Sequence, residues 1–148
     1  PWFRTEGERY GRDGCRVPIP WSADAPAYGF SPSGETWLPQ PGEWAELARD
    51  RQVGDGASTL SLYRDLLRLR REHGLGTGTL EWVDGYSDDV VALRVSSGTG
   101  AVTVLANAGS EAVELPADAQ VLVSSATREV MADAGTLLPS DTTVWLAG

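Results

Sequence analysis

The apolar and polar positions of this 148-residue chain divide it into three zones. From Pro1 to about Gly56 no sustained period of two or of 3.6 residues is present, and this zone holds seven of the nine prolines and four of the six tryptophans. So long a stretch without periodicity is typical of functional loops or of a segment that lacks a neighbour. Within it, GEWAELARDR at 42–51 predicts one short helix.

The second zone is STLSLYRDLLRLRREH at 58–73, which predicts an amphipathic helix. Leu62, Leu66 and Leu69 recur at the spacing of one helix face. Ser58 is a suitable N-cap, and Gly74 suits the left-handed residue that often follows a helix. The leucine stripe needs a partner, and without one it would leave an exposed apolar patch.

The third zone, Thr77 to Gly148, alternates short β-prone runs with turn signals. In DVVALRVS, Val91, Leu93 and Val95 alternate with smaller or polar residues, which indicates that these three share the buried face. About six strands without intervening helices predict a small antiparallel β-sandwich or Greek-key sheet. The runs are TLEWV, DVVALRVS, AVTVLAN, EAVELP, QVLVSS and TTVWLA.

Composition excludes several classes of partner. The formal net charge is −9, so the chain would be repelled by a nucleic-acid backbone. No run of about 18 apolar residues indicates a membrane span, and no signal-like leader is present. The single cysteine, Cys15, fits a reducing cytoplasm. All twelve basic residues are arginine, a bias typical of a GC-rich genome, and a chain that begins Pro1-Trp2-Phe3 is expected to be a piece of a longer protein.

The titratable residues indicate no complete catalytic site. His73, the only histidine, lies at the end of the predicted helix, and with Cys15 it is too little for a zinc site. A glycosidic acid–base pair needs two carboxyls about 5–9 Å apart, and the sequence spacing places no such pair. The tryptophans suit either sugar stacking or hydrophobic anchoring of loops. The loop carboxylates considered are Asp13, Asp24, Glu35 and Glu43.

The segment GRDGCRVPIPW at 11–21 is built differently from the rest of its zone. Its two arginines present planar guanidinium forks that suit carboxylates or vicinal hydroxyls. The glycines beside them allow unusual backbone angles, and Pro18 and Pro20 stiffen the chain on the C-terminal side of the arginines. From the residues alone, a structural ion pair and a ligand contact remain equally open.

Three segments in order resemble one enzyme family. GRDGCRVPIPW, YGFSPSGETWLP at 28–39 and the helix at 58–73 resemble the C-terminal third of α-glucosidases in the α-amylase superfamily, glycoside hydrolase family 13. The family pattern has Thr and Met where this chain has Val17 and Ile19. The likeness is specific over residues 9–72, favours the bacterial α-glucosidase branch, and extends over 73–148 only as a domain type.

The resemblance implies a fold and a role for four residues. Residues 1–76 would be the C-terminal end of a catalytic (β/α)8 barrel, with a long loop over 1–57 and its last helix over 58–73, and residues 77–148 would be an all-β C-terminal domain. Arg12 would bind hydroxyls of the terminal glucose of an α-glucosyl oligosaccharide, while Asp13, Arg16 and Trp21 would support that loop.

By the same resemblance the parent enzyme would be a retaining, exo-acting α-glucosidase whose catalytic carboxylates lie upstream, on the missing barrel. The chain alone would then be inactive, would hold no cofactor, and any calcium or magnesium site would also lie upstream. Two alternatives stay open: a non-catalytic carbohydrate-binding or structural β module, and the tail of a transglucosylase such as a sucrose isomerase or trehalose synthase. The preference between α-1,4 and α-1,6 linkages and the oligomeric state stay open too.

Overall fold

The computed structural model describes Glu6 and residues 16–148, so Arg12 and Asp13 lie outside the described residues. The chain forms two compact units, Pro1–Asp55 and Gly56–Gly148, called unit 1 and unit 2 below. The division falls before the long helix, which therefore belongs to the same compact unit as the strands. The assignment of residues 1–76 to a barrel stays a prediction. None of the helices in the described residues is long and apolar enough to cross a membrane.

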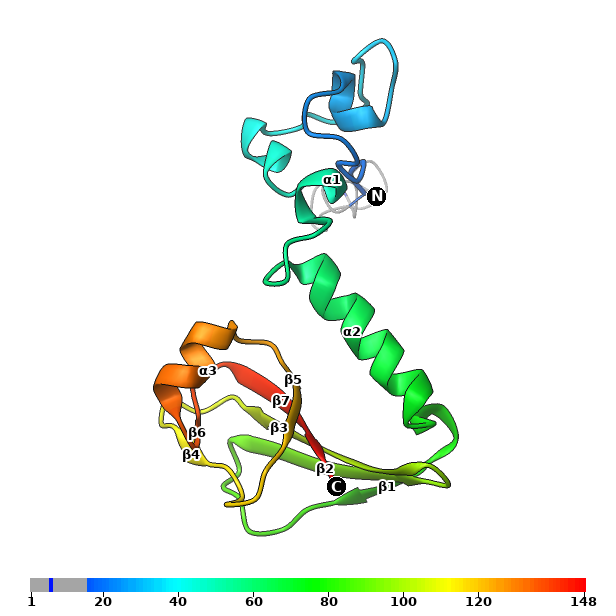
Figure 1. The fold of residues 1–148 in the computed structure, drawn as a ribbon. Helices are drawn as coiled ribbons and strands as arrows, with labels where there is room; N and C mark the ends of the chain where they lie inside the picture. Colours follow the sequence, from blue (N-terminus) through cyan, green and yellow to red (C-terminus); the bar gives the residue numbers. More distant parts are fainter. Residues whose placement is uncertain (1–5, 7–15) are drawn as a thin grey trace. The chain divides into compact units, whose positions relative to one another are not determined.

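Unit 2 is an antiparallel β domain with two helices of more than one turn (Figure 1). Its five-stranded sheet has the order β1-β2-β3-β7-β5, and β4 pairs with β6 in a second, two-stranded sheet. The mainly β, antiparallel class predicted from the sequence is confirmed. The elements are α2 (Thr59–Glu72), η5 (Leu75–Thr77), β1 (Thr79–Trp82), β2 (Val90–Ser97), β3 (Gly100–Asn107), β4 (Val113–Glu114), β5 (Val121–Ser124), α3 (Arg128–Ala134), β6 (Leu137–Leu138) and β7 (Thr142–Ala147).

Helix α2 agrees with its prediction within one residue at each end. The side chain of Ser58 accepts a hydrogen bond from the backbone N–H of Ser61 at 3.2 Å, which satisfies one free amide of the first turn. Gly74 has φ of 60°, as its place after the helix requires. The hydroxyl of Ser97, at the end of β2, donates to the carbonyl of His73 at 2.6 Å and fastens the end of α2 to the sheet.

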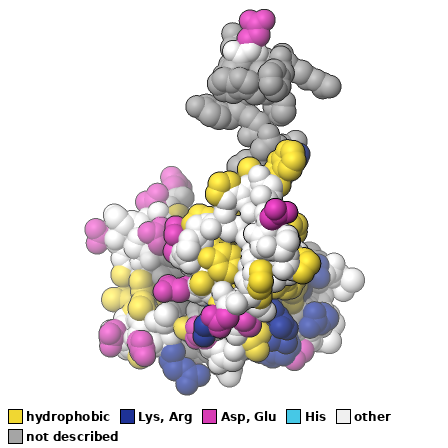
Figure 2. Space-filling model, turned by 90° about the horizontal axis from the view of Figure 1, so that it is seen from above, with side chains coloured by type: hydrophobic (Ala, Val, Ile, Leu, Met, Phe, Trp, Pro, Cys, Tyr) yellow, Lys and Arg dark blue, Asp and Glu magenta, His cyan; other side chains and the backbone are white. Residues whose placement is uncertain are grey.

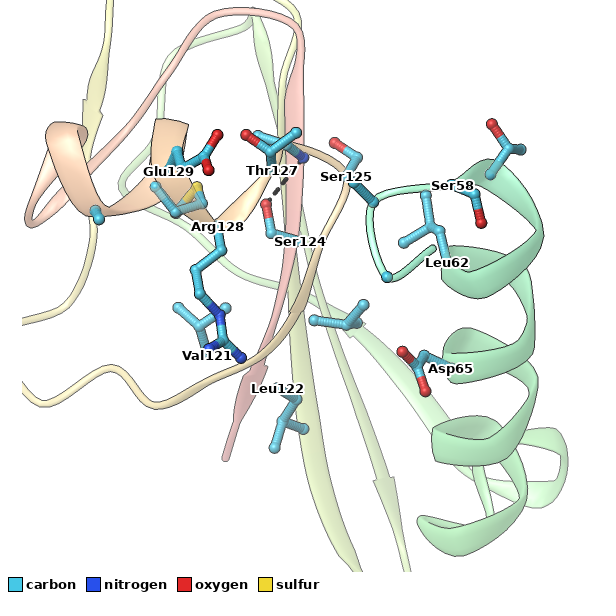
Figure 3. Close-up of a pocket in the computed structure, with 17 residues that line it drawn as sticks. Ser58, Leu62, Asp65, Val121, Leu122, Ser124, Ser125, Thr127, Arg128 and Glu129 are labelled. Atoms are coloured by element: carbon cyan, nitrogen blue, oxygen red, sulfur yellow. Dashed lines mark hydrogen bonds between the residues drawn. The ribbon is translucent and has the colours of Figure 1, made fainter. Parts of the chain in front are cut away.

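The main core lies on one face of the large sheet. Ala92, Leu105 and Val144 occupy one rung across β2, β3 and β7, and all three are buried. They pack with Leu115, Leu138 and Leu146, and Met131 of α3 covers the cluster. Figures 1 and 3 show α3 and α2 on opposite sides of the sheet.

The prediction for the buried face of β2 was wrong. Ala92 is buried in the main core, whereas Val91 is exposed and Leu93 and Val95 are half-buried on the other face. The physical reason is that the small side chain of Ala92 fits under the two-stranded sheet and α3. The other face of β2, toward α2, is only partly covered. Alternation of large and small residues therefore misidentified the core side.

Two further expectations need correction. Helix α3 interrupts the strands, although no helix was expected between them; Thr127 caps it by accepting from the N–H of Val130. In unit 1, the helix expected over 42–51 is two short pieces, η4 (Gly42–Ala45) and α1 (Arg49–Gln52). Extended backbone at Ala48 (ψ of 142°) breaks the helix between them.

Candidate functional site

The PIPW end of the sequence motif at 11–21 is held by backbone hydrogen bonds. The carbonyls of Pro20 and Trp21 accept from the N–H groups of Arg49 and Asp50, at 2.9 and 3.1 Å. The N–H groups of Trp21 and Ser22 both donate to the carbonyl of Tyr28, at 2.8 and 3.0 Å. These bonds tie the loop to α1 and to the following turn, the 3₁₀ helix η3 (Pro26–Gly29).

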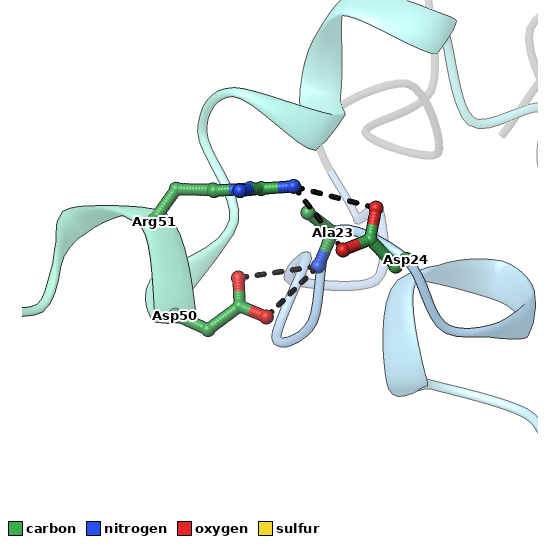
Figure 4. A network of polar contacts seen from close by, with 4 residues as sticks. All are labelled: Ala23, Asp24, Asp50 and Arg51. Carbon is green, nitrogen blue, oxygen red and sulfur yellow. Dashed lines mark hydrogen bonds and ion pairs between the residues drawn. The ribbon is translucent and has the colours of Figure 1, made fainter.

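Side chains of α1 complete this attachment (Figure 4). Both carboxylate oxygens of Asp50 accept from the N–H of Ala23, at 3.1 and 3.2 Å. The guanidinium of Arg51 pairs with the carboxylate of Asp24 at 3.1 Å. We call this set, Ala23, Asp24, Asp50 and Arg51, the polar brace. Because Asp24 is engaged here, this loop carboxylate has a structural partner.

Of the four residues predicted to bind the sugar or support the loop, the structure describes Arg16 and Trp21. Arg16 is exposed and Trp21 is 50% exposed, and the hydrogen bonds of Trp21 described above are made by its backbone. With Arg12 and Asp13 outside the described residues, the roles given to all four stay predictions. Sequence reasoning did not predict the polar brace. The only local signal of the polar brace in the sequence is the Asp50-Arg51 pair within a short helix.

Unit 2 has a groove of about 790 Å³ between the start of α2 and the segment that joins β5 to α3. Figure 3 shows Ser58, Leu62 and Asp65 on one side and Ser124, Ser125 and Thr127 on the other. Most of its hydroxyls already serve the backbone: Ser124 and Ser125 accept from the N–H groups of Ala126 and Thr143, at 3.0 and 2.8 Å. Ser58 and Thr127 are helix caps.

Two carboxylates line the groove, Asp65 and Glu129, and Asp65 pairs with the guanidinium of Arg68 at 3.3 Å. Neither a histidine nor a cysteine is among the residues that line it, so no nucleophile–base pair forms there. In the part of the chain that the structure describes, no group of three or more His, Cys, Asp or Glu side chains could hold a metal ion.

The tryptophans of the β domain do not form a continuous platform. Trp82 and Trp145 lie on one rung and one face of the sheet, separated by Leu93 and Val104. Adjacent strands are about 4.8 Å apart, so the two tryptophans stand about 14 Å apart across the sheet. Trp145 is only partly exposed, whereas Trp82 on the edge strand is 71% exposed. A carbohydrate-binding module built on this sheet would therefore have one exposed aromatic ring, that of Trp82, rather than a row of aromatic rings.

Known proteins similar to this chain are carbohydrate-active enzymes. No protein-family model matches it. The chain is 39% identical over 109 residues to a probable α-glucosidase of Rhizobium meliloti, covering 72% of this chain and 19% of that protein. It is 28% identical over 123 residues to maltase A1 of Drosophila melanogaster, covering 77% of this chain and 21% of that protein.

A solved structure extends the similarity to the fold. Trehalulose synthase MutB from Pseudomonas mesoacidophila superposes with a TM-score of 0.71 and 26% identity over 97% of this chain and 27% of that one. The chain thus spans about a fifth to a quarter of the length of the proteins it matches. Its β domain corresponds to the C-terminal β domain of such enzymes.

Proposed function

Because this chain belongs to the α-glucosidase-like enzymes of the α-amylase superfamily and corresponds to their C-terminal part, we propose that it completes a retaining, exo-acting α-glucosidase. The enzyme would hydrolyse terminal α-glucosidic bonds in oligosaccharides. The observation that carries this proposal is the match to α-glucosidases over most of the chain together with the fold match over 97% of it.

The catalytic carboxylates belong, in this proposal, to the part of the enzyme that the chain does not cover. Retaining glycosidases need a nucleophile and an acid/base carboxyl about 5–5.5 Å apart. In the described residues, Asp24 and Asp50 are engaged in the polar brace, and Asp65, one of the two carboxylates that line the groove of unit 2, is paired with Arg68. Any calcium or magnesium site also lies in the uncovered part, and the single cysteine keeps the cytoplasm as the expected compartment.

Arg12 is the residue of this chain that we propose to contact substrate. Its guanidinium would donate hydrogen bonds to hydroxyls of the terminal glucose, with the loop held by Asp13, Arg16 and Trp21. The backbone bonds of Pro20 and Trp21 support such a role, because they anchor the loop only a few residues after the arginine pair. A fixed donor of this kind accelerates reaction by orienting the sugar ring.

To test this proposal, the complete reading frame that contains this chain is expressed. The protein product is then assayed on a chromogenic α-glucoside, on maltose and on isomaltose. We expect α-glucosidase activity from the complete product and none from the 148-residue chain alone. Replacement Arg12→Lys should lower kcat/KM by roughly 100-fold, since a lysine lacks the bidentate fork. Arg94→Lys is the control: it makes the same change at an exposed arginine of β2 and should change kcat/KM by less than roughly fivefold.

Two results would refute the proposal. Turnover of the chromogenic substrate by the 148-residue chain would place catalysis within it. A reading frame that adds no barrel with catalytic carboxylates would favour the binding-module alternative.

The transglucosylase alternative has its own support, because the fold match is to a trehalulose synthase. Incubation of the complete product with sucrose separates the two reactions. A hydrolase releases glucose and fructose, whereas a transglucosylase converts most of the sucrose into an isomer, which chromatography of the products distinguishes.

A further inference from the structure

The turn that follows the motif at 11–21 is wound left-handed. Ala27 and Tyr28 have φ of 47° and 50°, both with ψ of 36°, and Gly29 follows with φ of 80°. This conformation is unfavourable for residues with a Cβ and usually occurs at single positions rather than in succession. The hydroxyl of Tyr28 helps to hold the turn, because it donates to the carbonyls of Pro41 and Gly42, at 3.1 and 3.2 Å. Strained backbone of this kind is typical of functional sites.

The left-handed turn fixes the backbone of Trp21. The N–H of Trp21 donates to the carbonyl of Tyr28 at 2.8 Å, and the carbonyl of Trp21 accepts from the N–H of Asp50 at 3.1 Å. A Cβ placed on Gly29 would lie 3.4 Å from the Cβ of Trp21, so the turn also packs closely against this residue. The position of the Trp21 backbone, and the direction in which its side chain leaves it, are therefore set by the fold.

The ring of Trp21 is open although its backbone is fixed. Trp21 is 50% exposed. Figure 2 shows hydrophobic side chains open at the surface among acidic ones, so the exposure of one ring is by itself ordinary. Trp37 gives the contrast: it is 96% exposed, and none of the backbone hydrogen bonds found among the described residues involves it. An indole on a rigid backbone loses less freedom on binding, and its apolar face suits the face of a sugar ring.

We propose that the indole of Trp21 stacks on the sugar unit that leaves when the enzyme cleaves a terminal α-glucosidic bond. This proposal rests on the proposed function. An exo-acting enzyme encloses the terminal glucose, while the rest of the oligosaccharide extends toward solvent, where a half-open ring can reach it. The resemblance gave Trp21 a supporting role in its loop, whereas the geometry assigns it a contact with the substrate.

The test compares two kinds of substrate with the complete reading-frame product. Maltose and isomaltose lose a glucose unit, whereas α-glucosyl fluoride has the same terminal glucose and no second sugar to stack on the ring. Trp21→Ala should lower kcat/KM by at least roughly tenfold for whichever disaccharide the enzyme cleaves faster. It should change kcat/KM for α-glucosyl fluoride by less than roughly threefold, and Trp21→Phe, which retains an aromatic face, should keep both values within roughly threefold.

Two further variants test the ring and the turn separately. Trp37→Ala removes a more exposed ring from the same unit and should leave both values within roughly twofold. Gly29→Ala places a Cβ at a φ of 80° and close to the Cβ of Trp21, so it should displace the indole. We expect this variant to lower kcat/KM for the disaccharide more than kcat/KM for α-glucosyl fluoride.

The other outcomes overturn the inference or the proposed function. Equal losses on both substrates after Trp21→Ala would show that the ring supports the fold, and an unchanged kcat/KM for the disaccharide would show that the substrate does not contact it. Either result overturns the inference and leaves the proposed function standing. A complete product without activity on any of these substrates would refute the proposed function. Isothermal titration with maltose then tests the inference, because Trp21→Ala must weaken binding by at least roughly tenfold.

Discussion

At the scale of single residues, Asn107 joins the segment after β3 to the end of β6. It lies at the end of β3 and is buried, and its amide N–H groups donate to the carbonyls of Glu111, Leu138 and Pro139, at 2.8, 3.2 and 3.1 Å. Its carbonyl oxygen accepts from the N–H of Gly109 at 2.9 Å. One side chain thus satisfies four backbone groups, two from the segment after β3 and two from the end of β6 and the residue that follows it.

Replacement Asn107→Asp should destabilise unit 2 although the side chain keeps its size. The change sets a carboxylate against three carbonyl oxygens, all of which lose their donor. We expect the free energy of unfolding to fall by about 2–4 kcal/mol, since buried unsatisfied polar groups cost about 1–3 kcal/mol each and neighbouring losses are not additive. Urea denaturation measures this loss, and Gln120→Glu, at an exposed position, is the control that adds the same charge. An unchanged midpoint would mean that water replaces these donors.

At the scale of elements, helix α2 carries two kinds of leucine. Leu69 is 5% exposed, whereas Leu67, two residues earlier, is 51% exposed. Tyr63 lies exposed four residues before Leu67. The predicted stripe of Leu62, Leu66 and Leu69 is therefore the covered side of the helix, since all three are buried or half-buried, and this side contributes to the stability of unit 2.

Replacement Leu69→Ala should lower the free energy of unfolding by about 2–4 kcal/mol, the cost of removing a buried leucine side chain. Leu67→Ala is the matched control and should cost less than about 1 kcal/mol, because alanine favours the helix and little apolar contact is lost. Chemical denaturation followed by circular dichroism compares the two. Equal losses would show that Leu67 is covered in solution.

The elements also show which features the sequence was able to predict. Helix α2 has all its signals nearby in the chain: the cap at Ser58, the leucine spacing and Gly74. Helix α3 had a cap at Thr127 and Gly135 after its end, yet its short apolar pattern lies between β-prone runs and was passed over. Strand β6, with two residues, carries too little pattern to be recognised.

Other features depend on contacts between distant parts of the chain. The buried side of β2 is decided by what covers each face, which the alternation at Val91 and Ala92 cannot reveal. In the candidate site, the Arg51–Asp24 pair joins residues 27 positions apart, and such pairing leaves no periodic signal. The residue pattern singled out the motif at 11–21, whereas the role of Arg12 came from the family resemblance, because the residues alone left an ion pair and a ligand contact equally open.

At the scale of the whole molecule, the two units differ in how they are stabilised. Unit 2 has a continuous apolar cluster under its large sheet. The described residues of unit 1 have only Ala23 and Ala48 buried. We expect unit 2 to unfold as one cooperative β domain, and unit 1 to contribute little to the free energy of unfolding.

Deletion of residues 1–55 should therefore leave the melting temperature of unit 2 nearly unchanged. We expect a shift of less than about 4 °C, which for a domain of this size corresponds to less than about 1 kcal/mol. Differential scanning calorimetry of the full chain and of Gly56–Gly148 provides the comparison. A fall of about 10 °C or more would instead show that unit 1 stabilises the sheet.

The place of β7 in the sheet has a consequence for synthesis. Strand β7 (Thr142–Ala147) lies between β3 and β5, and its Val144 and Leu146 belong to the main core. While the ribosome is still translating Thr142 to Ala147, β3 and β5 have no neighbour to join them, and their unpaired edges are open to other chains. A premature stop codon shortly before Thr142 would therefore release a product with two such edges, a candidate for aggregation or degradation.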